Sequence, residues 1–179
     1  MATTLLSTIT PETIKSAFQE IMDDEAQHVS FFQTALKQAG VTPRPKPTFK
    51  GLEHSDIAEF IVMSGTLENA GVGAFLMAMP AIRDANAKAA AASIATIEAR
   101  HAGFVNSLLG KPLTDNGAFD KPISQKAIID AVSPFIESLN GGPDPAAELN
   151  SDSVILNFAL FLEHLEAEFY RVNVPRLFE

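Results

Sequence analysis

The sequence predicts an all-α protein, a four-helix bundle with one long connection that contains a short helix. Apolar residues recur at helical spacing in four long stretches, and segments rich in proline and glycine separate these stretches. A chain of 179 residues suits one domain, so we expect residues 1–179 to form a single unit with a substantial core. The predicted long helices span about residues 11–39, 55–79, 84–109 and 152–172.

Composition narrows the range of functions. The formal net charge of −9 argues against a nucleic-acid partner, because such partners are usually bound by a basic face. The chain has no cysteine, which excludes disulfides, thiolate zinc sites and iron–sulfur clusters. Any metal must therefore be held by carboxylates, imidazoles and water.

The first eleven residues lack the basic segment and the continuous apolar run of a secretory signal. No apolar run approaches the ~20 residues of a membrane span. We therefore expect a cytoplasmic protein with no membrane partner, although a chain from which a signal had been removed would look the same.

The first helix begins with a capping pattern. Thr10 is a good N-cap, Pro11 suits the first helical position, and Gly40 is placed to end the helix. Residues 41–50 then carry three prolines at alternate positions, which forbid helix and favour an extended path. At about 3.1 Å per residue this segment spans roughly 30 Å, enough to cross the length of a bundle.

The second and third helices are predicted to form an antiparallel pair. Within the second helix, residues 60–79 are apolar nearly all round, as in a buried helix, and a tight corner at residues 80–84 leads into the third helix. Glu68 is the one charged residue in the apolar part of the second helix. At about 1.5 Å per residue, Glu68 and Glu98 both lie roughly 21–24 Å from the corner, so they face each other at one level.

Residues 110–151 form a long connection rich in proline, glycine, asparagine and aspartate. Within it we expect a short amphipathic helix over residues 124–139, bent by Pro134. Such a connection fits a compact domain only where it crosses from one end of the fold to the other. The last helix is expected to end before Pro175.

An internal repeat places metal-ligand side chains on two of the helices. The pattern E-A-x-H-x-x-F begins at Glu25 and again at Glu98. Residues three apart lie on one face of a helix, so His28 points the same way as Glu25, and His101 the same way as Glu98.

The other two long helices each carry a Leu-Glu pair with an aromatic residue seven positions after the glutamate. A dimetal site in a helical bundle takes a Glu from each of two helices and Glu-x-x-His from each of the other two. A single E-x-x-H occurs often by chance, but four helices that fit the pattern together favour a metal site. The predicted ligands are Glu25, His28, Glu68, Glu98, His101 and Glu163.

Carboxylates and imidazoles suit iron or manganese, so we expect two iron ions, two manganese ions or one of each. Two carboxylates would bridge the ions, and each histidine would bind one of them. Two divalent cations against four carboxylates leave the core neutral, whereas without metal some glutamates would have to take up protons. A cluster that persists without metal, with protonated or lysine-paired glutamates, is the alternative.

Four further residues, outside the set of six ligands, have separate predicted roles. Tyr170 is the candidate catalytic residue, as a hydrogen-bonding or redox partner of the site, with a plain core aromatic as the alternative. Glu166 is a further ligand or an outer carboxylate. We expect His164 and His54 to be surface or packing residues. Glycines of the second helix near Glu68 would leave room for a small molecule over the site.

With these residues the sequence resembles the ferritin-like superfamily, in particular the stress-linked group that includes plant desiccation-related proteins. The matching pieces touch all four long helices, at residues 24–29, 67–76, 92–101 and 158–170. In that family the lone-Glu helix comes first, whereas here it comes last, as in a circular permutation. Residues 110–150 would then return the chain to this helix. Exchange of the helix between two copies in a swapped homodimer is the alternative.

The resemblance implies a ferritin-like bundle with a non-haem dimetal centre that reacts with dioxygen or peroxide. The reactions it implies are ferroxidase-type oxidation of Fe(II), catalase-like removal of peroxide, and oxidation of an organic substrate. A stress-protective or interaction protein, with a structural metal and no turnover, is the alternative. Whether the chain is an enzyme therefore stays open at this stage.

Overall fold

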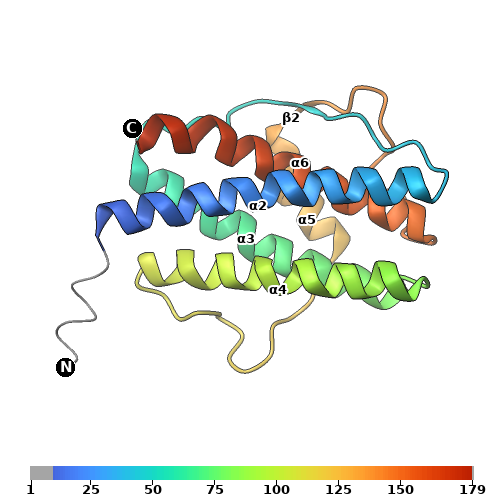
Figure 1. Ribbon diagram of the computed structural model, residues 1–179, viewed down its shortest axis with the longest axis horizontal. Coiled ribbons are helices and arrows are strands. Elements are labelled where there is room, and N and C mark those ends of the chain that lie inside the picture. The colour runs from blue at the N-terminus through green and yellow to red at the C-terminus, as the bar shows by residue number, and fades with distance from the viewer. Residues whose placement is uncertain (1–9, 179) are drawn as a thin grey trace.

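A computed structural model describes residues 10–178, in which four long helices pack side by side (Figure 1). This arrangement confirms the predicted all-α bundle. The expectation that the N-terminus carries no signal falls on residues 1–9, which lie outside the described part. The long helices are α2 (Pro11–Gln38), α3 (Ile57–Ala78), α4 (Ala85–Leu108) and α6 (Asp152–Leu177).

Polar side chains cap the helices and fix where they begin. Thr10 and Thr13 form a reciprocal capping box at the start of α2, with Pro11 in the first turn. Asp56 accepts hydrogen bonds from two backbone N–H groups at the start of α3, and Asp84 accepts one at the start of α4. These three helices begin within two residues of their predicted starts.

The bundle consists of two antiparallel helix pairs. α2 packs along α6, and α3 packs along α4 after the corner formed by the 3-10 helix η1 (Met79–Ala81). The Asp152 carboxylate at the start of α6 accepts hydrogen bonds from the backbone N–H groups of Arg83 and Asp84. These bonds tie the corner of one pair to the start of the other.

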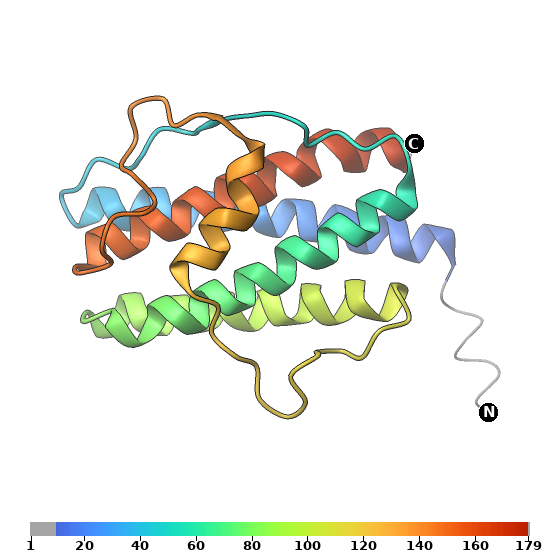
Figure 2. The same ribbon diagram turned by 180° about the vertical axis from the view of Figure 1, so that it is seen from behind.

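The proline-rich segment between α2 and α3 is extended and runs along α6 (Figures 1 and 2). Near its start, the backbone N–H of Arg44 donates to the side chain of Asn157. Near its end, Asn173 donates to the carbonyl of Leu52 and accepts from the N–H of His54. The crossover predicted from the prolines is therefore present, and it is fixed to α6 at both ends.

The end of α6 differs from the prediction. The helix continues through Pro175 to Leu177 instead of ending near residue 172. Asn173 and Val174 are buried, and the hydrogen bonds of Asn173 to the crossover hold the last turn in place. Tertiary packing therefore overrides the local helix-breaking tendency of the proline.

The long connection also differs from the prediction. Its helix, α5 (Gln125–Val132), is shorter than expected, and Pro134 lies in a separate 3-10 turn, η2 (Ser133–Phe135), rather than bending a longer helix. The chain then forms β2 (Ile136–Ser138), which pairs antiparallel with β1 (Thr48–Phe49) of the crossover. This small sheet was not predicted. It fastens the connection to the crossover outside the bundle.

The α3 region has the length and apolar composition of a membrane span. Within residues 10–178, Ile57–Ala81 has a mean hydropathy of 1.3 in its most apolar window, and 56% of that window is buried inside the bundle. The expectation that no segment would approach a membrane span was therefore wrong. A core helix passes the same test because it is surrounded by other elements, so this is weak evidence for a membrane. Location in the cytoplasm stays a prediction.

Apolar side chains fill the bundle in two layers, with a polar layer between them. On α2, Phe18 and Ile21 belong to one apolar layer and Phe32 and Leu36 to the other. Glu25 lies on the same buried face between them. The apolar layers therefore shield the polar side chains at mid-length of the bundle from water.

Candidate metal centre

Side chains from all four long helices meet in the polar layer. The structure brings together all six sequence-predicted ligands, and none of them is more than 8% exposed. Their role as metal ligands stays a prediction. They are Glu25 and His28 from α2, Glu68 from α3, Glu98 and His101 from α4, and Glu163 from α6.

One half of the cluster surrounds His28. Its Nδ1 lies 3.3 Å from Glu25 Oε2, 3.3 Å from Glu98 Oε1 and 3.2 Å from Glu163 Oε2. A single ring nitrogen carries one proton or one lone pair, so it satisfies at most one of these three oxygens at a time. Three oxygens around one nitrogen are better explained by a common positive partner.

The other half surrounds His101. Its Nδ1 lies 3.1 Å from Glu25 Oε1 and 3.3 Å from Glu68 Oε2. Glu25 is therefore shared between the halves, with one oxygen toward each histidine. In the sequence prediction two carboxylates bridge the ions, and Glu25 occupies a bridging position between the two groups.

Seven atoms of this cluster are buried without a hydrogen-bond partner, which is the strongest sign that something else pairs with them. Leaving buried polar atoms unpaired is costly, and more so when they are charged. The seven are Glu25 Oε1, Glu68 Oε2, both carboxylate oxygens of Glu98 and of Glu163, and Nδ1 of His101.

The spacing of the cluster atoms fits metal coordination. Atoms that bind one ion at about 2.0–2.2 Å lie about 3.0–3.5 Å from one another. The contacts around the two histidines, 3.1–3.3 Å, have this spacing. The donor set, carboxylates with one imidazole in each half, is compatible with a divalent metal ion such as iron or manganese. The residues present therefore fit one divalent ion beside each histidine.

In the protein alone, protons would take the place of these cations. Burial opposes the charged form of His101, but its contacts with Glu25 and Glu68 outweigh burial and raise its pKa to about 11. The pKa of His28 is raised in the same way by Glu163, Glu25 and Glu98. Burial alone would raise the pKa of Glu25, yet its contacts with His101 and His28 lower it to about 2.

The pKa values of the other carboxyl groups in the cluster are raised, in contrast to that of Glu25. Burial raises the pKa of Glu163 to about 8, despite its contact with His28. Burial, followed by repulsion from neighbouring carboxylates, raises the pKa of Glu98 and Glu166 well above the ordinary value, and burial also raises that of Glu68. Several glutamates therefore keep protons that a metal ion would displace on binding.

Asp24 orients one of the two histidines. Its Oδ2 lies 3.3 Å from the outer nitrogen, Nε2, of His101. A carboxylate at this position holds the proton on Nε2 and leaves Nδ1 free to bind a metal. The equivalent position in the second repeat, directly before Glu98, is Ile97. The sequence analysis did not assign Asp24 to the site. Its place directly before an E-x-x-H motif was the available signal.

Tyr170 is joined to the cluster through Glu68. Its hydroxyl donates a hydrogen bond to Glu68 Oε1, and its side chain is fully buried. Burial and the neighbouring Glu68 charge raise the pKa of the phenol well above its ordinary value, so it remains a donor. This contact gives Tyr170 the hydrogen-bonding place predicted for it. A catalytic role stays a prediction.

The predicted glycines of the second helix are Gly65, Gly71 and Gly73 of α3, and of these Gly71 faces the cluster. A Cβ atom at this position would lie 2.5 Å from Glu98 Oε2 and 3.3 Å from Glu166 Oε1. The other two glycines do not make room for a small molecule, because Leu109 packs against Gly65 and Ile123 against Gly73. Glycine at position 71 therefore allows the α3 backbone to approach two carboxyl groups.

The other two histidines lie outside the cluster. His164 is buried on α6, and burial together with nearby Lys46 and Arg44 lowers its pKa to about 4. His54 packs against the edge of the Phe169 ring. Both are placed as the sequence analysis expected for packing residues.

Comparison with known proteins adds a family relationship. A family model described as a ferritin-like domain matches residues 2–111. This match covers α2, α3 and α4, and so five of the six cluster residues. No curated protein and no solved structure matches the chain.

Proposed function

Because the chain belongs to the family of ferritin-like domains, we propose that it is a non-haem dimetal protein that reacts with dioxygen or peroxide. The presence of seven buried, unpaired donor atoms in one cluster around two histidines carries this proposal. Glu98, Glu163 and His28 would hold one ion, Glu68 and His101 the other, and Glu25 both. Two iron or manganese ions would supply redox chemistry by cycling between the +2 and +3 states.

The residues around the ions have separate tasks in this proposal. Asp24 orients His101, and Tyr170 holds Glu68 through one oxygen so that the other faces the metal. Glu98 and Glu163 have both oxygens free of hydrogen bonds, so their carboxylates are able to shift as the charge of the centre changes. The apolar layers above and below shield the centre from water along the axis of the bundle.

We also propose that α6 is the family's first helix, moved to the end of the chain, and that the chain belongs to the desiccation-related group. Two observations support the permutation. α6 packs antiparallel along α2, and the Phe178 ring lies 5.3 Å from that of Phe18, so the end of α6 adjoins the start of α2. A short link there would restore the family order. A single chain supplies the whole cluster, so a helix-swapped homodimer is not needed to complete it.

Anaerobic loading with Fe(II) or Mn(II), followed by elemental analysis, tests metal binding. The proposal predicts two ions per chain, and Glu25→Gln should lower the affinity for both because Glu25 belongs to both halves. A chain that binds no metal would support the metal-free alternative. Glu12→Gln, an exposed change in the first turn of the same helix, is the control.

Exposure of the loaded protein to dioxygen or hydrogen peroxide tests reactivity. The proposal predicts consumption of the oxidant together with oxidation of the metal, followed with an oxygen electrode and by near-ultraviolet absorbance. A protein that binds two ions and consumes neither oxidant would instead be a stress-protective or interaction protein with a structural metal.

A further inference from the structure

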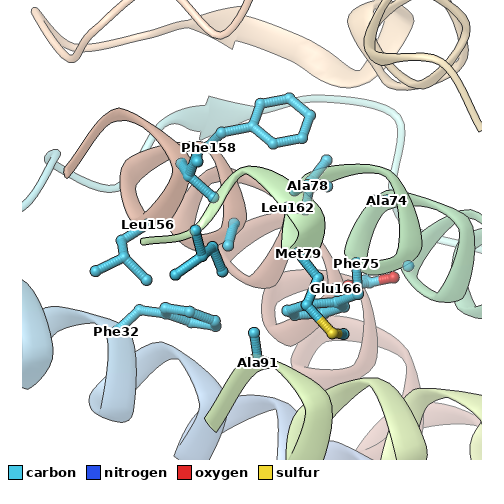
Figure 3. A pocket seen from close by; sticks show the side chains of 14 residues that line it. Phe32, Ala74, Phe75, Ala78, Met79, Ala91, Leu156, Phe158, Leu162 and Glu166 are labelled. Carbon is cyan, nitrogen blue, oxygen red and sulfur yellow. The ribbon is translucent and has the colours of Figure 1, made fainter. Parts of the chain in front are cut away.

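The bundle contains an apolar cavity of about 20 Å³ beside the metal centre (Figure 3). It lies among α2, α3, α4 and α6, in the apolar layer of Phe32, Ala91 and Leu156. Among its lining residues Glu166 is the one with an ionisable side chain. All the lining residues are buried except Met79, which is half-buried and marks the end nearest to solvent.

The inner end of this cavity reaches the metal centre. Gly71 and Glu166 both line the cavity. A Cβ atom on Gly71 would meet Oε2 of Glu98, a predicted ligand, at 2.5 Å and Oε1 of Glu166 at 3.3 Å. One glycine is therefore all that separates the cavity from a carboxylate of the centre.

The size and lining of the cavity select its occupant. About 10–15 Å³ is enough for one water molecule, so a cavity of about 20 Å³ has room for a very small molecule. Water needs two to four polar partners to be held in a cavity, and here the Glu166 carboxyl is the one polar side-chain group. Apolar cavities in proteins stay dry and take small apolar molecules such as xenon. Dioxygen has the matching size and polarity.

Two wider grooves also reach the centre, and each carries polar side chains beside a histidine. Grooves of about 340 and 360 Å³ lie between α2 and α4. One reaches His101 between Asp24 and Arg100, and the other reaches His28 beside Gln27. Charged and hydrogen-bonding groups suit metal ions and a hydrogen-bonding oxidant such as peroxide.

We propose that the apolar cavity is the binding site for dioxygen and that dioxygen reaches the metal centre from it past Gly71, whereas hydrogen peroxide arrives through the two grooves between α2 and α4. This inference rests on the proposed function and names the route of one of its two oxidants. It assigns the cavity a ligand that can be detected with no metal in the protein.

Xenon provides the first test, because it is an apolar probe with a strong anomalous signal. Crystals of the metal-free protein under xenon pressure should show one xenon atom between Phe32, Ala78 and Ala159. Ordered water in this space, or xenon bound elsewhere but not here, would overturn the proposal. This result does not depend on whether the loaded protein reacts with any oxidant.

Filling the cavity provides the second test. Ala78→Val adds two methyl groups to the cavity wall, and Ala95→Val makes the same change at a buried position of the same apolar layer that does not line the cavity. In iron-loaded protein, Ala78→Val should slow the reaction with dioxygen by roughly tenfold or more, because overpacking removes the space for the gas. The reaction with peroxide should stay within about twofold of the parent.

The matched variant separates the possible outcomes. Equal slowing by Ala78→Val and Ala95→Val, or equal slowing with both oxidants, would overturn the proposal. Failure of the loaded parent protein to react with either oxidant would instead overturn the proposed function, and the xenon result would then decide the cavity alone. If Ala78→Val does not fold, Ala159→Val narrows the same cavity from α6.

Discussion

The two histidines of the centre differ in what contacts their outer nitrogen. Asp24 lies beside Nε2 of His101, whereas no described residue hydrogen-bonds Nε2 of His28. A carboxylate on the outer nitrogen raises the basicity of a metal-bound imidazole and fixes its orientation. The repeat places Ile97 where Asp24 would be needed. We therefore expect the ion beside His101 to be held more tightly by its histidine.

The first prediction is that Asp24→Asn weakens one metal position. Loss of an outer-shell carboxylate costs about 10- to 100-fold in metal affinity. Anaerobic titration with Mn(II), followed by calorimetry, should show a loss in one of two binding phases. Asp23→Asn, at the exposed neighbouring position, is the control. Equal weakening of both phases by Asp24→Asn would contradict the assignment to His101.

The second prediction uses Tyr170 as a built-in reporter. The chain has one tyrosine and no tryptophan, so its intrinsic emission comes from Tyr170 alone. Because the Tyr170 hydroxyl donates to Glu68, binding of iron at the centre should quench this emission. A fluorescence titration with Fe(II) under argon measures the effect. Unchanged emission after two ions have bound would place the metal away from Glu68.

At the scale of the element, α3 shows how packing overrides helix propensity. Glycine inside a helix costs up to about 1 kcal/mol relative to alanine. Gly71 nevertheless lies in the middle of α3, because a Cβ atom there would meet Glu98 at 2.5 Å. Glycine has the lower helix propensity, but at this position it lets the backbone of α3 approach the carboxyl groups.

The third prediction contrasts two glycines. Gly71→Ala should lower metal affinity and thermal stability, since the new methyl group displaces the Glu98 carboxylate. Gly103→Ala on α4 is the matched change, because its Cβ would meet its nearest neighbour, Leu113, at an ordinary 3.9 Å. That variant should be neutral or more stable by up to about 1 kcal/mol. Similar thermal and metal-binding behaviour of both variants would be inconsistent with a close approach at Gly71.

Local signals explain how much of the fold was predictable. Caps and apolar periodicity located the starts of α2, α3 and α4 within two residues. The end of α6 was missed because buried Asn173 and Val174 outweigh Pro175. The small sheet was missed because β1 and β2 are far apart in the sequence, and the local sequence of neither short strand predicts the pairing.

The same reasoning applies to the site. The repeat identified the six clustered side chains, since glutamate and histidine at helical spacing on apolar faces are visible in one sequence. Asp24 was not assigned to the site, and the close approach of Gly71 to Glu98 was not predicted, because both depend on contacts with another helix. The cavity beside the centre exists only once four helices are packed together.

For the whole molecule, metal should reverse the dependence of stability on pH. The pKa of Glu163 is raised to about 8, so folding favours its neutral form. Its contribution to the free energy of unfolding is therefore complete below pH 4.5 and is lost as the pH rises toward 8. The pKa of His101 is raised to about 11, so folding favours its charged form, and the stability that this contributes is lost between pH 6.5 and pH 11. Glu25, lowered to about 2, contributes above 4.5 and loses its contribution on acidification.

The fourth prediction follows from these signs. Metal-free protein should be most stable near about pH 5 and less stable at about pH 8. Metal-loaded protein should gain stability over the same interval, because ligands must lose protons to bind metal. Urea unfolding with a chelator and with excess Mn(II) measures both slopes. Parallel slopes in the two series would mean that the metal does not displace protons from this cluster.

The central claim is that six side chains from four helices hold two metal ions at mid-length of the bundle. Diffraction from crystals of the metal-loaded protein, recorded at the iron and manganese absorption edges, tests it most directly. We predict two anomalous peaks, one beside Nδ1 of His28 and one beside Nδ1 of His101, with Glu25 between them. A single peak, or peaks at the surface while these side chains keep their metal-free contacts, would contradict the account.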